Sequence, residues 1–168
     1  MTIYIKFPLL YNKIMITIKQ IQNKEEKTTI VRNILESLTS WFEVEESRTD
    51  YIKRSADRDT FVAFDNDNPI GFLCIDETSK YTVEISVMGV KQAYHHQGIG
   101  RLLFKKAYEI AKAKGYHFIQ VKTVQMGKYK EYDITNLFYQ SLGFEEFEVI
   151  PLLWDEDNPC QIYVMSIN

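Results

Sequence analysis

The feature that most limits the fold is a strand-like segment that leads through two closely spaced glycines into a helix. The stretch VKQAYHHQGIGRLL, residues 90–103, places Gly98 and Gly100 two positions apart just before an amphipathic pattern. Glycine lets the backbone approach a ligand closely, and the amides at a helix start favour an anion. Arg101 is a cation in the first helical turn, where it opposes the helix dipole unless an anion lies nearby. The segment therefore predicts either a phosphate-binding loop or a tight strand–helix turn.

Two common phosphate-binding motifs do not fit this segment. The dinucleotide fingerprint requires a third glycine, and Leu103 stands at that position. The P-loop requires a Gly-Lys-Ser/Thr sequence, which does not follow here. Both classes of nucleotide-binding protein are therefore excluded.

The hydrophobic pattern on either side predicts a mixture of strands and helices. Alternating or β-rich runs predict strands at residues 16–22, 60–64, 70–75, 81–90, 118–124, 146–153 and 161–167. Apolar residues at three- and four-residue spacing predict helices at residues 23–42, 45–56, 98–114 and 134–142. Asn23 is expected to cap the first helix, while Gly115 and Gly143 are expected to end the last two. The order β-α-α-β-β-β-α-β-α-β-β predicts one α+β domain over residues 15–168.

Composition and charge exclude several function classes. The net charge of −3 over 168 residues argues against a general nucleic-acid binder, which needs a basic face. No apolar run approaches the ~18 residues of a transmembrane helix, so we expect no membrane association. Cys74 and Cys160 have no metal-ligand spacing, so we expect no metal and a reduced, cytoplasmic pair of thiols. Residues 1–14 show no signal-peptide cleavage site; they are either an extension upstream of a second start at Met15 or an extra N-terminal strand or arm.

The glycine segment resembles the phosphate motif of the GCN5-related N-acetyltransferases, Gln/Arg-x-x-Gly-x-Gly/Ala, at residues 95–100. The longer family pattern, Val-x-Pro-x-Tyr-x-x-x-Gly-Ile-Gly, is matched at Val90, Tyr94 and residues 98–100. A second family pattern, Phe-Tyr-x-x-x-Gly-Phe, is matched at residues 138–144. The chain departs from the family at Gln92, where proline is usual, and at His95, where Gln or Arg is usual. The resemblance covers residues 16–167 and implies a mixed, mostly antiparallel sheet of six to seven strands with about four helices.

The resemblance implies acetyl-CoA as co-substrate and no metal. The pyrophosphate of acetyl-CoA is expected to bind the main chain of residues 96–101. The cofactor-binding residues that the resemblance implies there are His95, His96, Gln97, Gly98, Ile99, Gly100 and Arg101. The main chain of Met88 and Val90 is expected to pair with the pantetheine arm, which would run between the strands at 81–90 and 118–124. Asn136 is a weaker candidate for the same arm, since the family's usual asparagine position is occupied by Tyr132.

Two side chains are expected to carry the chemistry. Tyr139 matches the family's general-acid tyrosine, and a phenol with an ordinary pKa of ~10 stays protonated until a thiolate forms. Glu84 is the candidate base, acting directly or through water. Strand alternation places Glu84 on the face opposite Val83 and Ile85. The structural alternatives are a tyrosine packed on the core and a carboxylate on a solvated strand face.

The implied function is transfer of acetyl from CoA to a primary amine, on a small molecule or a protein, in a bacterial and cytoplasmic enzyme. Homodimers are common in the family. Acidic and aromatic residues indicate either a pocket for a cationic acceptor or a solvated loop: Trp41, Phe42, Glu43, Glu45, Glu46, Trp154 and Asp155. The alternatives are transfer of a longer acyl group and a non-catalytic acyl-CoA-binding module.

Overall fold

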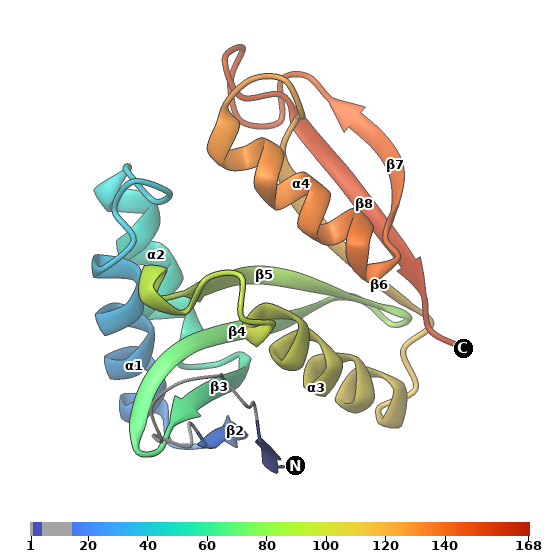
Figure 1. The fold of residues 1–168 in the computed structure, drawn as a ribbon. Coiled ribbons are helices and arrows are strands. Elements are labelled where there is room, and N and C mark those ends of the chain that lie inside the picture. The colour runs from blue at the N-terminus through green and yellow to red at the C-terminus, as the bar shows by residue number, and fades with distance from the viewer. Residues whose placement is uncertain (1, 5–14) are drawn as a thin grey trace. The chain divides into compact units, whose positions relative to one another are not determined.

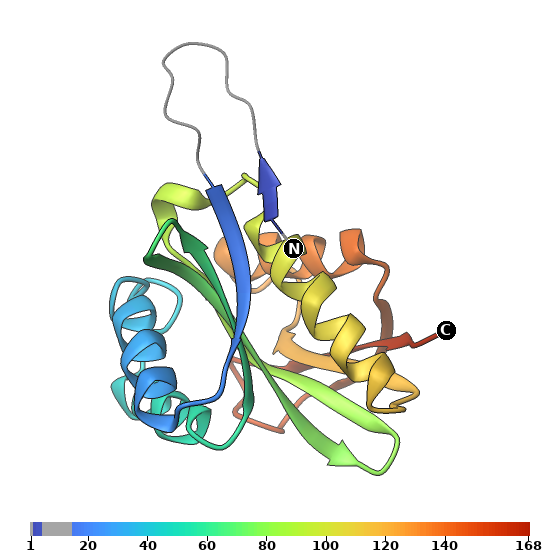
Figure 2. The same cartoon turned by 90° about the horizontal axis from the view of Figure 1, so that it is seen from below.

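The computed structural model describes residues 2–4 and 15–168 (Figures 1 and 2). Its strands are β1 (Thr2–Tyr4), β2 (Met15–Ile21), β3 (Asp59–Asp65), β4 (Asn68–Ser79), β5 (Thr82–Val90), β6 (Phe118–Val124), β7 (Glu145–Ile150) and β8 (Cys160–Ser166). Its helices are α1 (Lys24–Glu36), α2 (Glu45–Ser55), α3 (Ile99–Ala113) and α4 (Lys130–Leu142), with a 3₁₀ turn η1 at Gln92–Tyr94.

The predicted fold class and element order are confirmed. The strands are hydrogen-bonded in the order β1-β2-β3-β4-β5-β6-β8-β7. β5 and β6 are parallel, whereas the pairs β1–β2, β2–β3, β3–β4, β6–β8 and β7–β8 are antiparallel. The short β1 adds an eighth strand beyond the six or seven expected. It comes from the predicted N-terminal extension, of which residues 1 and 5–14 lie outside the described residues.

The chain divides into two compact units, and β4, β5 and α3 each contribute residues to both. The first unit comprises Met1–Ile75 and Val87–Ala107. Its core lies where α1 packs on the sheet: Ile30, Val31, Ile34, Leu35 and Leu38 of this segment are buried together with Val62 and Phe72. Figure 1 shows α1 and α2 side by side in this unit.

Helix α1 begins as predicted but ends earlier. The Asn23 side chain accepts a hydrogen bond from the Glu26 amide at 2.8 Å, which confirms it as the N-cap. The prediction that the helix continues to Phe42 is wrong, because α1 ends at Glu36. The Ser37 hydroxyl donates to the Ile34 carbonyl at 2.7 Å, a local bond that competes with the helix. The apolar spacing persists past this point because Trp41 still packs on the same core.

The second unit comprises Asp76–Ser86 and Tyr108–Asn168. Its sheet follows the registers Glu84↔Gln120, Gln120↔Val164 and Lys122↔Ile162. α4 lies along β6 and β8 (Figure 1), and Gly143 ends it with a positive φ of 100°. This helix begins four residues before the predicted Ile134, with Glu131 and Asp133 in its first turn where they suit the dipole. The last predicted strands are confirmed, but β7 ends at Ile150, and a turn follows.

Candidate functional site

The predicted phosphate loop connects the end of β5 to α3 in the first unit. Two of its residues have left-handed backbone: His96 with φ 59° and Gly98 with φ 79°. The Leu102 amide donates to the Gly98 carbonyl at 3.1 Å, so the amides of Ile99 and Gly100 precede the first helical bond. Left-handed residues alternating along a turn before a helix aim successive amides into a concavity that suits an anion.

A second feature of this loop is the open space beside Gly98. A Cβ built at this position meets nothing within 4 Å, so glycine is required by the backbone angle and the space beside it is open. A non-glycine residue rarely adopts positive φ, and His96 does so in the same loop. Such strain is often found at binding sites.

The His95 side chain is bonded and packed within the first unit, and its predicted phosphate contact stays a prediction. Its Nε2 lies 2.6 Å from the Val90 carbonyl oxygen, so this nitrogen donates and the carbonyl accepts. Its ring meets the Trp41 ring edge-on, with centroids 5.4 Å apart. The side chain that replaces the usual Gln or Arg therefore holds the loop against β5 and the α1–α2 connection.

Two neighbouring side chains hold the same loop. The Tyr94 hydroxyl donates to Asp65 Oδ2 at 2.8 Å, and this carboxylate raises the pKa of the Tyr94 phenol. The Gln97 side chain donates to the Ala93 carbonyl at 3.0 Å. These bonds hold the loop without using the amides of residues 99 and 100, which donate no backbone hydrogen bond within the part of the chain that the structure describes.

Glu84 lies in a polar cluster of the second unit. Its Oε2 accepts hydrogen bonds from Gln120 at 2.7 Å and from the Lys122 ammonium at 2.6 Å. The ion pair is largely shielded, with side-chain exposures of 16% for Glu84 and 29% for Lys122. Among the described residues, both bonds go to Oε2, so Oε1 remains for a further proton or donor.

Tyr139 lies in the layer between α4 and the sheet, with 5% of its surface exposed. Its ring centroid is 5.9 Å from that of Phe144 and 6.5 Å from that of Tyr163. This aromatic packing fixes the ring, so the phenol cannot swing freely. The pattern Phe-Tyr-x-x-x-Gly-Phe is explained in part by this contact between its tyrosine and its last phenylalanine.

Asn136, one turn before Tyr139, is fully buried and bonded within the protein. Its amide nitrogen donates to the Val124 carbonyl at 2.9 Å and to the Tyr132 carbonyl at 2.7 Å. Its oxygen accepts from the Tyr163 hydroxyl at 2.8 Å. These bonds dock α4 on β6, and the predicted contact of Asn136 with the pantetheine arm stays a prediction.

The structure places the candidate acid and base on opposite faces of the sheet. Val121 lies opposite Tyr163 in the β6–β8 register, and Tyr163 contacts α4. Glu84 lies on the other face of the sheet, which it shares with Gln120 and Lys122. Tyr139 and Glu84 therefore approach the strands from two sides.

Sequence reasoning did not find the partners of Glu84. Gln120 and Lys122 alternate with buried Ile119 and Val121 along β6, so their common face was readable from the sequence. Their pairing with Glu84, which lies 36 and 38 positions earlier in the chain, depends on the register of β5 and β6, and no local pattern determines that register.

The remaining chemistry-bearing residues do not form a second centre among the described residues. Cys74 and Cys160 are both buried thiols, and burial raises the pKa of Cys160 to about 11. No group of three or more His, Cys, Asp or Glu side chains able to hold a metal occurs in residues 2–4 and 15–168. The His117 ring stacks on the Tyr81 ring with their centroids 4.7 Å apart, which is a packing contact. None of the described helices is long and apolar enough to span a membrane.

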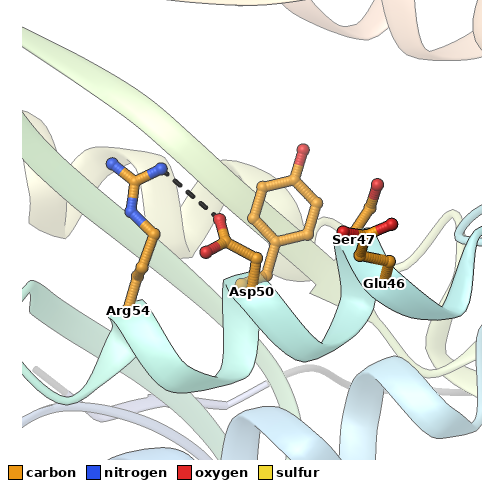
Figure 3. Close-up of a pocket in the computed structure, with 5 residues that line it drawn as sticks. Glu46, Ser47, Asp50 and Arg54 are labelled. Atoms are coloured by element: carbon orange, nitrogen blue, oxygen red, sulfur yellow. Dashed lines mark hydrogen bonds and ion pairs between the residues drawn. The ribbon is translucent and has the colours of Figure 1, made fainter.

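Two open pockets, of about 320 and 610 Å³, lie on α2 in the first unit. Every lining residue belongs to this one helix, and they include Glu45 and Glu46. Figure 3 shows Arg54 reaching Asp50, with an N–O distance of 3.5 Å. A groove lined by carboxylates of a single helix does not define a binding site. The predicted acceptor pocket therefore stays a prediction.

Comparison with known proteins agrees with this architecture. A family model described as the acetyltransferase (GNAT) domain matches residues 56–146, more than half of the 168 residues. A search of curated proteins finds no match.

Solved structures of GNAT proteins share the fold over nearly the whole chain. A GNAT-family structure from Desulfovibrio desulfuricans has a TM-score of 0.80 at 18% identity, covering 91% of this chain and 99% of its own. An aminoglycoside 6'-N-acetyltransferase solved with coenzyme A has a TM-score of 0.69 at 17% identity, covering 90% and 97%. YncA of Salmonella typhimurium, solved with its cofactor acetyl-CoA, has a TM-score of 0.66 at 18% identity, covering 91% and 94%. At these identities the likeness shows the fold alone.

The class defined by the fold and the family model is the GNAT acetyltransferases. This chain belongs to that family, and the prediction of an acyltransferase enzyme is confirmed at this level.

Proposed function

We propose that the protein transfers an acetyl group from acetyl-CoA to a primary amine by direct attack of the amine on the thioester. The observation that carries this proposal is the loop before α3, where two left-handed residues precede the amides of Ile99 and Gly100. Such a loop suits a pyrophosphate, and acetyl-CoA is the pyrophosphate-bearing donor that fits a GNAT acetyltransferase domain.

The donor supplies an activated acetyl thioester, and the residues of this chain would bind it and move protons. In the proposed binding mode, the amides of residues 96–101 hold the pyrophosphate, and His95 and Tyr94 keep the loop in shape. The main chain of Met88 and Val90 is proposed to pair with the pantetheine arm. Arg101 is exposed in the first turn of α3, where its charge favours a bound anion.

The two proposed proton transfers involve residues on opposite faces of the sheet. An amine is mostly protonated at pH 7 and must lose a proton to attack, which we assign to the Glu84 carboxylate, directly or through water. The departing sulfur then takes a proton from the Tyr139 hydroxyl on the opposite face. Separate faces keep the acid and the base from exchanging a proton with each other before the reaction.

Binding of acetyl-CoA is the first expected result. A ligand at 100 times its dissociation constant adds about 2.7 kcal/mol to the free energy of unfolding, which raises the melting temperature of a domain this size by roughly 5–10 °C. The measurement is thermal unfolding with and without millimolar acetyl-CoA. ATP, which carries phosphates but no pantetheine arm, serves as the control ligand. An unchanged melting temperature with acetyl-CoA would contradict the proposed function.

Replacing Glu84 by Gln is expected to lower the rate and remove one ionisation from the pH–rate profile. The amide keeps the size and can still accept from Gln120, but it cannot take a proton. The matched control is Lys122→Met, which breaks the same ion pair and leaves the carboxylate in place. We expect a rate loss of about 10²-fold for Glu84→Gln, the lower end for a general base, and a much smaller loss for the control. Equal losses in both variants would mean that the ion pair, not the base, matters.

The acceptor is proposed to be an amine, either on a small molecule or on a protein. An aminoglycoside acetyltransferase is among the solved structures with this fold, which supports an amine without naming this chain's substrate. A bacterial, cytoplasmic and homodimeric enzyme is proposed on the family resemblance.

A further inference from the structure

Strand β6 of the second unit carries a buried hydroxyl, that of Thr123. Thr123 of β6 is only 5% exposed, and its Oγ1 has no hydrogen-bond partner among the residues that the structure describes. A buried hydroxyl is normally paired, because water can no longer bond to it. An unpaired buried hydroxyl therefore indicates that a group of a bound ligand forms the missing hydrogen bond.

The location of Thr123 identifies the layer into which its side chain points. Thr123 lies opposite Gln161 in the β6–β8 register, in phase with Val121 and its partner Tyr163. Tyr163 donates to Asn136 of α4, so this face of β6 is the one covered by α4. The next residue, Val124, accepts from Asn136 through its carbonyl at 2.9 Å.

Tyr139 lies in the same layer. It follows Asn136 by one helical turn, and both residues are buried between α4 and the sheet. Thr123 and Tyr139 thus come from a strand and a helix that pack against each other, β6 and α4. If Tyr139 protonates the leaving sulfur, the carbonyl carbon and oxygen of the thioester lie one and two bonds from that sulfur.

We propose that the Thr123 hydroxyl donates a hydrogen bond to the carbonyl oxygen of the bound acyl thioester. This inference rests on the proposed function and adds a donor-contacting residue to it. The bond holds the carbonyl in place and strengthens as its oxygen gains negative charge during attack by the amine. The buried apolar side chains on the same face, Ile119 and Val121, lower the local dielectric and favour such a bond.

The decisive experiment compares acetyl-CoA with CoA, which lacks the carbonyl, in calorimetric titrations of the wild type and Thr123→Val. Valine keeps the shape and removes the hydroxyl. We expect the variant to lose about tenfold in affinity for acetyl-CoA, the effect of one hydrogen bond, and to bind CoA as the wild type does. Without ligand, we expect it to melt no lower than the wild type, because an unpaired buried hydroxyl has been removed.

A matched control is available in the other unit. Thr17 of β2 also has a buried Oγ1 without a partner among the described residues. Thr17→Val is expected to leave both affinities unchanged. If Thr123→Val does not fold, the pair Thr123→Ser and Thr123→Ala tests the same hydroxyl, and only the alanine variant is expected to lose acetyl-CoA affinity.

Two results would overturn the inference, and they differ. If the variants without the hydroxyl bind acetyl-CoA and CoA as the wild type does, Thr123 is an unpaired core residue while the proposed function stands. If the wild type itself binds neither ligand, the proposed function fails and takes this inference with it.

Discussion

Replacing Tyr139 by Phe is expected to lower kcat by about 10²-fold or more while leaving the KM for acetyl-CoA close to its wild-type value. Without the phenol, the sulfur must leave as a thiolate unless water reaches it, and general-acid catalysis typically contributes 10²–10⁴-fold. The aromatic packing against Phe144 and Tyr163 does not involve the hydroxyl, so the ring should keep its position. The measurement is CoA thiol release under saturating acetyl-CoA with an amine found by screening.

The control for this variant is another tyrosine. Tyr116, between α3 and β6, donates its hydroxyl to Glu77 at an exposed position. Tyr116→Phe therefore removes a hydrogen-bonded phenol outside the proposed machinery and should keep full kcat. If Tyr139→Phe also keeps full kcat with an unchanged pH profile, Tyr139 is a core residue and another group protonates the sulfur.

The second large effect is expected at Gly98. A residue with a Cβ must adopt a φ near 79° there, which costs on the order of 1 kcal/mol, or must move the loop. Moving the loop turns the amides of Ile99 and Gly100 away from the phosphates. Losing two charge-assisted hydrogen bonds at about 1.5 kcal/mol each would weaken binding roughly 100-fold. We therefore expect Gly98→Ala to raise the dissociation constant of acetyl-CoA by that factor.

Gly115 is a close match for Gly98 in backbone geometry. Its φ is 81°, and a Cβ built on it also meets nothing within 4 Å. Gly115→Ala should therefore lose a similar amount of stability without any change in acetyl-CoA affinity. Thermal unfolding and calorimetric titration of both variants separate strain from binding. Equal affinities in the two variants would argue against a phosphate site at the start of α3.

The two halves of the candidate site differ in how far local sequence explains them. The loop at residues 90–103 forms its own geometry, because glycine conformations and helix-start amides are properties of neighbouring residues. His95 shows the limit of that reasoning. Its position in the motif predicts a phosphate contact, but no local pattern indicates its ring contact with Trp41, 54 positions earlier in the chain.

The sequence by itself determined the family resemblance, the element order, the caps at Asn23 and Gly143, and the alternating face that holds Glu84. Each of these depends on patterns within one element or across one turn. Only the tertiary structure decided that Lys122 and Gln120 bond to Glu84 and that Asn136 is used within the fold. It also decided that the Thr123 hydroxyl, beside α4, has no hydrogen-bond partner among the described residues. These facts depend on strand register and helix docking, which bring together residues that are distant along the chain.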